Sequence, residues 1–215
     1  MFILGLTGSI GMGKSTAGRL FAEAGVPVHD AYAAVHRLYD GEAVAAIGAA
    51  FPGTTSAGKV DRAKLAARVI DDDAAIKRLE AIVHPQVRQS EDRFLAEAAS
   101  RGARVVVLDI PLLFETGGEE RVDAVVVVSA PAEAQRARAL DRPGMTPAKL
   151  DAILQKQMPD SEKRARAHFV VDSSRAIDST RTQVRGILRA VAALPGRRMQ
   201  DRGQTTGNGL SSVVG

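Results

Sequence analysis

The chain has 215 residues, of which 45% are hydrophobic and 25% are charged, and it contains no cysteine. This composition is typical of a globular protein and excludes a fibre, a disulfide scaffold, thiol catalysis and thiolate metal sites. The 29 basic and 25 acidic side chains give a net charge of +4.

The positive charge is concentrated in two segments. Residues 135–166 hold eight basic and four acidic side chains, and a further excess lies in residues 196–215. A local excess suits a small polyanion better than a long duplex, and 4% aromatic residues supply few surfaces on which bases could stack. No apolar run approaches the length that spans a bilayer. We therefore expect a cytoplasmic protein that binds neither nucleic acid nor membrane.

Apolar runs rich in β-branched residues predict five strands. They cover residues 2–6, 26–28, 104–108, 122–128 and 169–171. These runs lack polar alternation, as expected for parallel strands that are covered on both faces, and helical stretches separate them. The predicted fold is therefore α/β, with a five-stranded parallel sheet flanked by helices.

The spacing of the strands predicts how the chain is divided. About 75 residues separate the second and third strands, far more than a crossover helix needs, so 31–101 is predicted to be an inserted helical lobe with breaks at Pro52-Gly53 and His84-Pro85. The basic segment 135–166 holds short helices, residues 175–194 form a closing helix, and 196–215 is a disordered tail. The core then consists of 1–30, 102–134 and 167–195.

Residues 8–15 match the phosphate-binding pattern G-x-x-x-x-G-K-[ST] between a predicted strand and a predicted helix. Glycines let successive backbone N–H groups face a phosphate, and the helix N-terminus adds favourable partial charge. Lys14 can reach the β and γ phosphates, while the Ser15 hydroxyl can bind Mg²⁺. We expect ATP and Mg²⁺ as ligands, with ATP contacted by Gly8, Gly11, Met12, Gly13, Lys14, Ser15 and Thr16.

Two aspartates come at the ends of predicted strands, where open α/β sheets bind their ligands. Asp30 follows Val28-His29 and either accepts a proton or binds Mg²⁺, or it caps the helix that starts at Ala31. Asp109 follows residues 105–108 and is either a metal-side acid or a buried turn residue.

An ordered set of motifs resembles the dephospho-CoA kinase family over roughly residues 1–194. The P-loop alone is shared by many families, whereas the ordered set is specific. The matching blocks are 5–16, 25–31 with Asp30, 60–62 with Leu65, 79–85, 109–115, and Gln157 with Lys163.

The resemblance implies a P-loop kinase-like fold and ATP-dependent phosphorylation of the ribose 3′-hydroxyl of dephospho-CoA, the last step of coenzyme A synthesis. It implies that 31–101 binds dephospho-CoA and that 135–166 is a lid over ATP. Asp30 would be the catalytic base, Lys14 and Arg142 would assist the transfer, and Arg138 and Arg142 would reach the ATP phosphates. Substrate contacts are expected from Arg62, His84, Pro85 and Leu112, with metal contacts from Ser15 and Asp109.

Two positions depart from the family pattern. Tyr32 and His168 stand where the family usually has aspartate, and the second change is expected to remove a structural hydrogen bond. His84 is either structural or in contact with substrate, and the lid arginines are otherwise solvated or paired with Asp141.

Other functions stay open. The alternatives are another small-molecule or nucleoside P-loop kinase, or a nucleotide-binding regulatory ATPase. We expect a monomer or weak oligomer.

Overall fold

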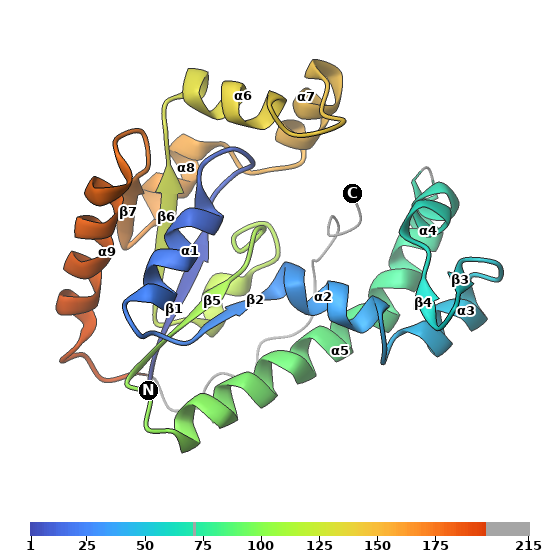
Figure 1. Cartoon of the computed structure of the whole chain (residues 1–215), viewed down its shortest axis with the longest axis horizontal. Coiled ribbons are helices and arrows are strands. Elements are labelled where there is room, and N and C mark those ends of the chain that lie inside the picture. Colours follow the sequence, from blue (N-terminus) through green and yellow to red (C-terminus); the bar gives the residue numbers. More distant parts are fainter. Residues whose placement is uncertain (71, 197–215) are drawn as a thin grey trace. The chain divides into compact units, whose positions relative to one another are not determined.

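The apolar runs form the strands of one parallel sheet. The computed structural model of the chain describes residues 1–70 and 72–196. Its main sheet has the order β2-β5-β1-β6-β7, in which β1 pairs in parallel with β5 and β6, and β6 pairs with β7 (Figure 1). The predicted five-stranded parallel sheet is confirmed. The strands are β1 (Phe2–Thr7), β2 (Val28–Asp30), β5 (Val105–Asp109), β6 (Ala124–Ser129) and β7 (Phe169–Asp172).

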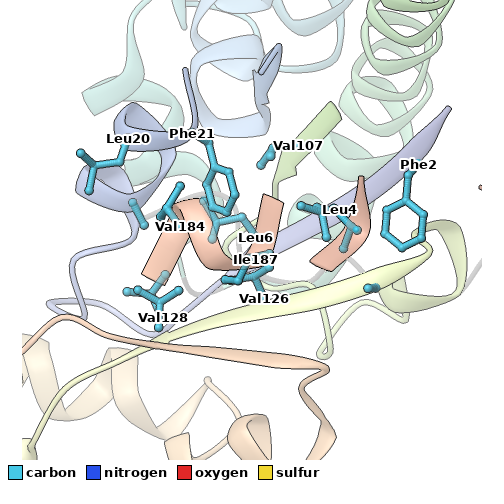
Figure 2. Packing of buried hydrophobic residues seen from close by; sticks show 14 residues of the cluster. Phe2, Leu4, Leu6, Leu20, Phe21, Val107, Val126, Val128, Val184 and Ile187 are labelled. Carbon is cyan, nitrogen blue, oxygen red and sulfur yellow. The ribbon is translucent and has the colours of Figure 1, made fainter. Parts of the chain in front are cut away.

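Both faces of the sheet are covered, which is why its strands are apolar at consecutive positions. On one face, Leu4 and Leu6 of β1 pack in a cluster with Phe21 of α1 (Lys14–Glu23) and Ile187 of α9 (Ile177–Val191), as Figure 2 shows. Gly5, between these leucines, faces the other way. A Cβ added there would lie 3.0 Å from side-chain carbons of Leu113 and Val122. Helices and loops thus exclude water from both sides of the strands.

The chain divides into two compact units. Among the described residues, one contains Met1–His29 and residues 98–196, and the other contains Asp30–Glu97. Besides the sheet, α1 and α9, the first unit holds η1 (Gly118–Arg121), α6 (Ala132–Leu140), α7 (Pro147–Gln155) and α8 (Asp160–Arg166).

The Asp30–Glu97 unit has its own hydrophobic core, in which Leu38, Ile47, Leu65 and Leu79 are buried together. Its elements are α2 (Ala31–Tyr39), α3 (Val44–Ala50), β3 (Thr55–Ser56), β4 (Lys59–Val60), α4 (Arg62–Val69) and most of α5 (Asp73–Ser100). The antiparallel pair β3–β4 was not among the predicted elements. Its strands are two residues long, too short to show a hydrophobic period.

The predicted break at His84-Pro85 is wrong. Helix α5 runs from Asp73 to Ser100 with Pro85 inside it. Proline removes one N–H donor and crowds the carbonyls of the preceding turn. The side-chain amide of Gln86 donates to the Ile82 carbonyl at 3.2 Å, which adds a hydrogen bond across the turn that contains Pro85. Burial of Leu79 and Val83 on the turns before Pro85 further stabilises the continuous helix.

The second strand lies two residues later than predicted. Pro27 cannot donate to a neighbouring strand, although its carbonyl accepts a hydrogen bond from Val107 N at 2.9 Å. Regular pairing therefore begins at Val28, and Asp30 becomes the last residue of β2. The predicted disordered tail, 196–215, lies outside the described residues except for Gly196. In the described ranges, no helix has both the length and the apolar character required to cross a membrane.

Candidate active site

The phosphate-binding loop lies between β1 and α1 and adopts backbone conformations that require glycine. Gly11 and Gly13 have φ angles of 78° and 83°, in the left-handed region that other residues rarely occupy. A Cβ at Gly11 would also lie 2.5 Å from the carbonyl oxygen of Gln135, which is closer than van der Waals contact allows. The two glycines therefore permit both the curl of the loop and the close approach of α6. Gly8 lies where the loop leaves β1.

Lys14 and Asp109 form an ion pair. Lys14 is the first residue of α1, and its Nζ contacts Oδ1 of Asp109, the buried last residue of β5. The Asp109 carboxylate thus holds the Lys14 ammonium at the end of the phosphate-binding loop. The two interpretations that the sequence left for Asp109 are compatible with this geometry, because the carboxylate is both buried and hydrogen-bonded.

The residues that could hold Mg²⁺ are Ser15 and Asp109. Ser15 is the exposed second residue of α1, and its hydroxyl is an oxygen ligand of the type that Mg²⁺ prefers. A Cβ added at Gly18, one turn further along α1, would lie 3.5 Å from Asp109 Oδ2, so the carboxylate lies beside the start of this helix. No group of three or more potential metal ligands occurs in the described part of the chain. Such a site therefore fits a magnesium ion that takes most of its ligands from water and nucleotide phosphates.

Side chains from distant segments hold the backbone of the phosphate-binding loop. Gln135 Nε2 donates to Ile10 O at 2.9 Å, and Ile10 N donates to Gln157 Oε1 at 3.2 Å. Ser173 Oγ donates to Met12 O at 2.8 Å. The sequence placed Gln157 in the family pattern without a role and did not single out Gln135 or Ser173, since each of the three lies more than 120 positions from the loop and no local pattern marks the contacts.

The two predicted phosphate-binding arginines have different surroundings. Arg138 of α6 donates to Ser173 Oγ at 3.1 Å and to Ser173 O at 2.9 Å. Arg142, two residues beyond the end of α6, is exposed, and its guanidinium has no hydrogen bond or ion pair among the described residues. Within that same part of the chain, neither arginine pairs with Asp141. Arg138 is therefore fixed beside the loop, whereas the guanidinium of Arg142 is available to an anion.

A buried charge pair connects α8 to the segment after β5. Lys163 is fully buried, and its Nζ lies 2.8 Å from Glu115 Oε1. The contact is a charge pair and not an aligned hydrogen bond, because Lys163 Nζ has no hydrogen-bond partner in the described structure. Met158 N donates to the same Glu115 oxygen at 2.8 Å, so one carboxylate anchors the stretch that leads into α8. Leu112, predicted to contact substrate, is 5% exposed in this region.

The expected loss of a hydrogen bond at His168 is wrong. Val125 N donates to His168 Nδ1 at 3.1 Å, and His168 N donates to Val125 O at 3.0 Å. The imidazole nitrogen therefore accepts the hydrogen bond that a carboxylate could accept at this position. The histidine keeps the start of β7 joined to β6.

In the Asp30–Glu97 unit, Asp30 is the N-cap of α2. Its Oδ1 accepts a hydrogen bond from Ala33 N at 3.0 Å, as the capping interpretation predicted. The side chain is nevertheless exposed, and the cap uses only one of its carboxylate oxygens. The cap and a role in proton transfer are therefore compatible.

Arg62 forms a polar cluster with two residues of α2. Its guanidinium donates to Tyr32 OH at 3.2 Å and lies 3.4 Å from His36 Nδ1, and the rings of Tyr32 and His36 meet edge to face with centroids 4.5 Å apart. No carboxylate pairs with Arg62 among the described residues. Burial raises the pKa of the nearby Tyr39, and the positive charge of Arg62 opposes that shift. The cluster thus keeps a positive charge without a bound counter-charge.

The other residues predicted to bind substrate in this unit lie on α5. His84 is half-buried, and Pro85 beside it is exposed.

A parallel sheet of this strand order, with a glycine-rich lysine loop between its first strand and first helix, defines a P-loop kinase-like nucleotide-binding protein. The lysine at the helix start and the aspartate at the end of the neighbouring strand suit it to binding a nucleoside triphosphate. The family model described as dephospho-CoA kinase matches residues 2–179. The chain belongs to the dephospho-CoA kinase family.

Individual relatives and solved structures match this chain over most of their own length. Dephospho-CoA kinase of Rhodopseudomonas palustris is 65% identical over 198 residues, which are 92% of this chain and 100% of that enzyme. The crystal structure of TT1252 from Thermus thermophilus is 37% identical with a TM-score of 0.76, covering 91% of this chain and 98% of that one. Dephospho-CoA kinase from Campylobacter jejuni, at 23% identity, shares the fold with a TM-score of 0.61, covering 88% and 96% of the two chains.

Proposed function

We propose that this protein transfers the γ-phosphoryl group of ATP to the ribose 3′-hydroxyl of dephospho-CoA, giving CoA and ADP. The observation that carries the proposal is the 65% identity to an enzyme named dephospho-CoA kinase along that enzyme's whole length. The phosphate-binding loop and its Lys14–Asp109 pair supply a nucleotide site of the required chemistry. The reaction would complete coenzyme A synthesis in the cytoplasm.

The nucleotide unit holds and neutralises the transferred group. Backbone N–H groups of the loop and the N-terminus of α1 bind phosphate oxygens, and Lys14 moves from Asp109 to the β and γ phosphates. Ser15 and Asp109 would hold Mg²⁺, which offsets negative charge on the phosphates when bound. Arg142 of the lid, residues 135–166, adds a further positive charge, and Arg138 lies beside the loop.

Asp30 acts on the acceptor. The ribose hydroxyl oxygen forms a bond to the γ-phosphorus as the bond to the β–γ bridging oxygen breaks, and the hydroxyl proton passes to the Asp30 carboxylate. ADP leaves with the bridging oxygen. Because Oδ1 caps α2, Oδ2 is the oxygen that we assign to the proton.

The lobe predicted over 31–101 binds the acceptor. Arg62 offers an unpaired positive charge to a phosphate of dephospho-CoA, and His84, Pro85 and Leu112 are further proposed contacts. The substrate is a small molecule, so neither nucleic acid nor a membrane is needed as a partner. The protein is proposed to act as a monomer or weak oligomer.

The test is ADP release by the purified protein with ATP, Mg²⁺ and dephospho-CoA, with the product checked by mass for one added phosphoryl group. A panel of nucleosides, sugar acids and shorter pantetheine compounds serves as the control set of acceptors. ADP release that requires dephospho-CoA, and that no other acceptor of the panel supports, agrees with the proposal. Release that is equal without an acceptor, or stimulated by DNA or RNA, contradicts it.

A further inference from the structure

Two glutamines, one at the start of the predicted lid and one near its end, hold the same residue of the phosphate-binding loop. We infer that Gln135 and Gln157 are positioning residues, which fix the loop through both backbone polar groups of Ile10 and thereby fix the lid on the loop. This inference rests on the proposed ATP-binding role of the loop. It concerns residues that touch the loop and not the phosphates themselves.

The direction of each hydrogen bond is determined by the backbone. Ile10 N–H can only donate, so the group of Gln157 that faces it must be the carbonyl oxygen, at 3.2 Å. Ile10 C=O can only accept, so Gln135 must present its NH₂ group, at 2.9 Å. One glutamine is thus used as an acceptor and the other as a donor, and substitutions at the two positions have different expected effects.

The anchor of Gln135 is rigid for a steric reason. Its side chain is 8% exposed, and its own carbonyl oxygen lies against Gly11, in the space that a Cβ would occupy. One residue of α6 therefore contacts two consecutive loop residues, Ile10 through its amide and Gly11 through its backbone. Movement of this turn of α6 would displace the loop.

The anchor of Gln157 is rigid because the following residues are tied to the sheet. Met158 N donates to Glu115 Oε1, and Glu115 pairs with the buried Lys163. Ser129 Oγ, at the end of β6, donates to Asp160 Oδ2 at 2.7 Å. Gln157 therefore extends to Ile10 from a stretch that cannot shift without breaking buried polar contacts.

The polar contacts between the two anchors include internal ones and the hydrogen bonds from Arg138 to Ser173, which lies outside the stretch. Arg136 pairs with Asp151 of α7 at 3.0 Å, and Lys149 Nζ donates to Gly144 O at 3.0 Å. The stretch 136–156, which carries Arg142, is thus held on Ile10 through the glutamines that flank it and on Ser173 through Arg138.

The first test measures ADP affinity by calorimetry, without acceptor, and the KM for ATP and the kcat with dephospho-CoA. Gln135→Met and Gln157→Met remove one hydrogen bond each at similar volume, and we expect each to weaken ADP binding and raise the ATP KM by about 3- to 10-fold, the scale of one such bond. Gln155→Met, at the exposed end of α7, is the matched control and is expected to change neither value. The acceptor KM should stay unchanged in all three.

Glutamate variants at the two positions test whether the loop requires the donor or acceptor group that faces Ile10, and not glutamine as such. Gln157→Glu keeps an acceptor for Ile10 N–H and should retain more ADP affinity than Gln157→Met. Gln135→Glu replaces the donor with an acceptor opposite Ile10 O and should retain less than Gln135→Met. The opposite order at either position overturns the inference.

A lower Tm with unchanged ADP affinity and ATP KM would show a merely structural role and would also overturn the inference. Because ADP binding needs no acceptor, this result is independent of whether dephospho-CoA is the substrate. Should one methionine variant not fold, the glutamate variant at the same position is compared with the parent protein, and we expect a smaller loss of ADP affinity for Gln157→Glu than for Gln135→Glu.

Discussion

In the nucleotide-binding unit, side chains from several distant segments hold the backbone of the phosphate-binding loop, whereas in the Asp30–Glu97 unit the polar side chains contact one another on two helices. Ile10 and Met12 are bonded by Gln135, Gln157 and Ser173. In the other unit Arg62 contacts Tyr32 across exposed surface. The loop is therefore preorganised, while the Arg62 cluster can rearrange at small cost.

This difference follows from what each region binds. A phosphate requires several N–H groups aimed at one point, and a loop with two left-handed glycines holds that shape only if other residues support it. An acceptor that is larger and chemically mixed is bound by long side chains whose rotamers adjust. Variants in the first unit should therefore alter catalysis steeply, and variants in the second should alter acceptor affinity modestly, with Asp30 as the exception.

Asp30→Asn is expected to give the largest effect. Asparagine caps helices as well as aspartate does, so α2 should keep its N-terminal hydrogen bond, but the amide cannot accept the acceptor's proton. We predict a fall in kcat of about 10²- to 10⁴-fold with ATP binding unchanged, measured by ADP release and by nucleotide titration.

The matched control is Asp61→Asn, because Asp61 caps α4 of the same unit through Lys64 N at 3.1 Å. Its backbone hydrogen bond to Lys64 holds the pKa of Asp61 below its ordinary value. We expect this variant to keep its kcat. Equal kcat in Asp30→Asn and the parent protein would reject Asp30 as the base.

Lys14→Ala comes next in size and tests the preorganised unit. Loss of the ammonium removes a charge that stabilises the transferred phosphoryl group and also removes the positive charge that pairs with the buried Asp109 carboxylate. We predict a fall in kcat/KM for ATP of about 10²- to 10³-fold. Lys59→Ala, which removes an exposed pair with Asp40, is the control and should have no effect on the rate. Unaltered ATP turnover in Lys14→Ala would disprove the assignment of the loop.

Local patterns explain what the sequence could predict. The glycines and Lys14 of the loop are close in the chain, so their joint function is visible as a motif, and the buried strands are visible as runs of β-branched residues. Pro85 was misinterpreted because a proline usually ends a helix, and the packing that carries α5 through it is tertiary.

Contacts between distant residues explain what the sequence could not predict. Gln135 and Gln157 lie 125 and 147 positions from Ile10, and although Gln157 belongs to the family pattern, a glutamine in a basic segment carries no local signal of a contact with the loop. Asp30 was predicted as a base, a magnesium ligand or a cap, and the structure shows the cap. Tertiary placement, not local propensity, determines the contacts of the two glutamines, whereas the Asp30 cap is local.

Arg62→Ala should have a moderate effect confined to the acceptor. The variant removes a positive charge that has no acidic partner among the described residues, so little stability depends on it. We predict an increase in the acceptor KM of about tenfold, the scale of one hydrogen bond to a charged group. The ATP KM should not change. Arg37→Ala, at an exposed position of α2, is the control. A larger change in the ATP KM than in the acceptor KM would contradict the assignment of Arg62 to acceptor binding.

The smallest expected effect is on stability, at Glu80 of α5. Desolvation by burial raises the pKa of Glu80, and the positive charge of Lys77 only partly opposes this. Glu80 Oε1 also has no hydrogen-bond partner in the described structure. Because the folded state binds the proton more tightly than the unfolded state, the resulting stabilisation is present below the ordinary carboxyl pKa of 4.5 and is lost as the pH rises through the raised value.

Glu80→Gln removes this dependence, since the amide is neutral at every pH. We predict a Tm about 1 °C above that of the parent protein at pH 7, corresponding to a few tenths of a kcal/mol after solvent screening, and a difference that approaches zero below pH 4.5. Asp92→Asn, at an exposed position of α5, should show no such trend in thermal melts from pH 4 to pH 7. A less stable Glu80→Gln variant at pH 7 would mean that attraction to Lys77 exceeds desolvation, so that the exposed charges of this unit support its fold as well as its binding.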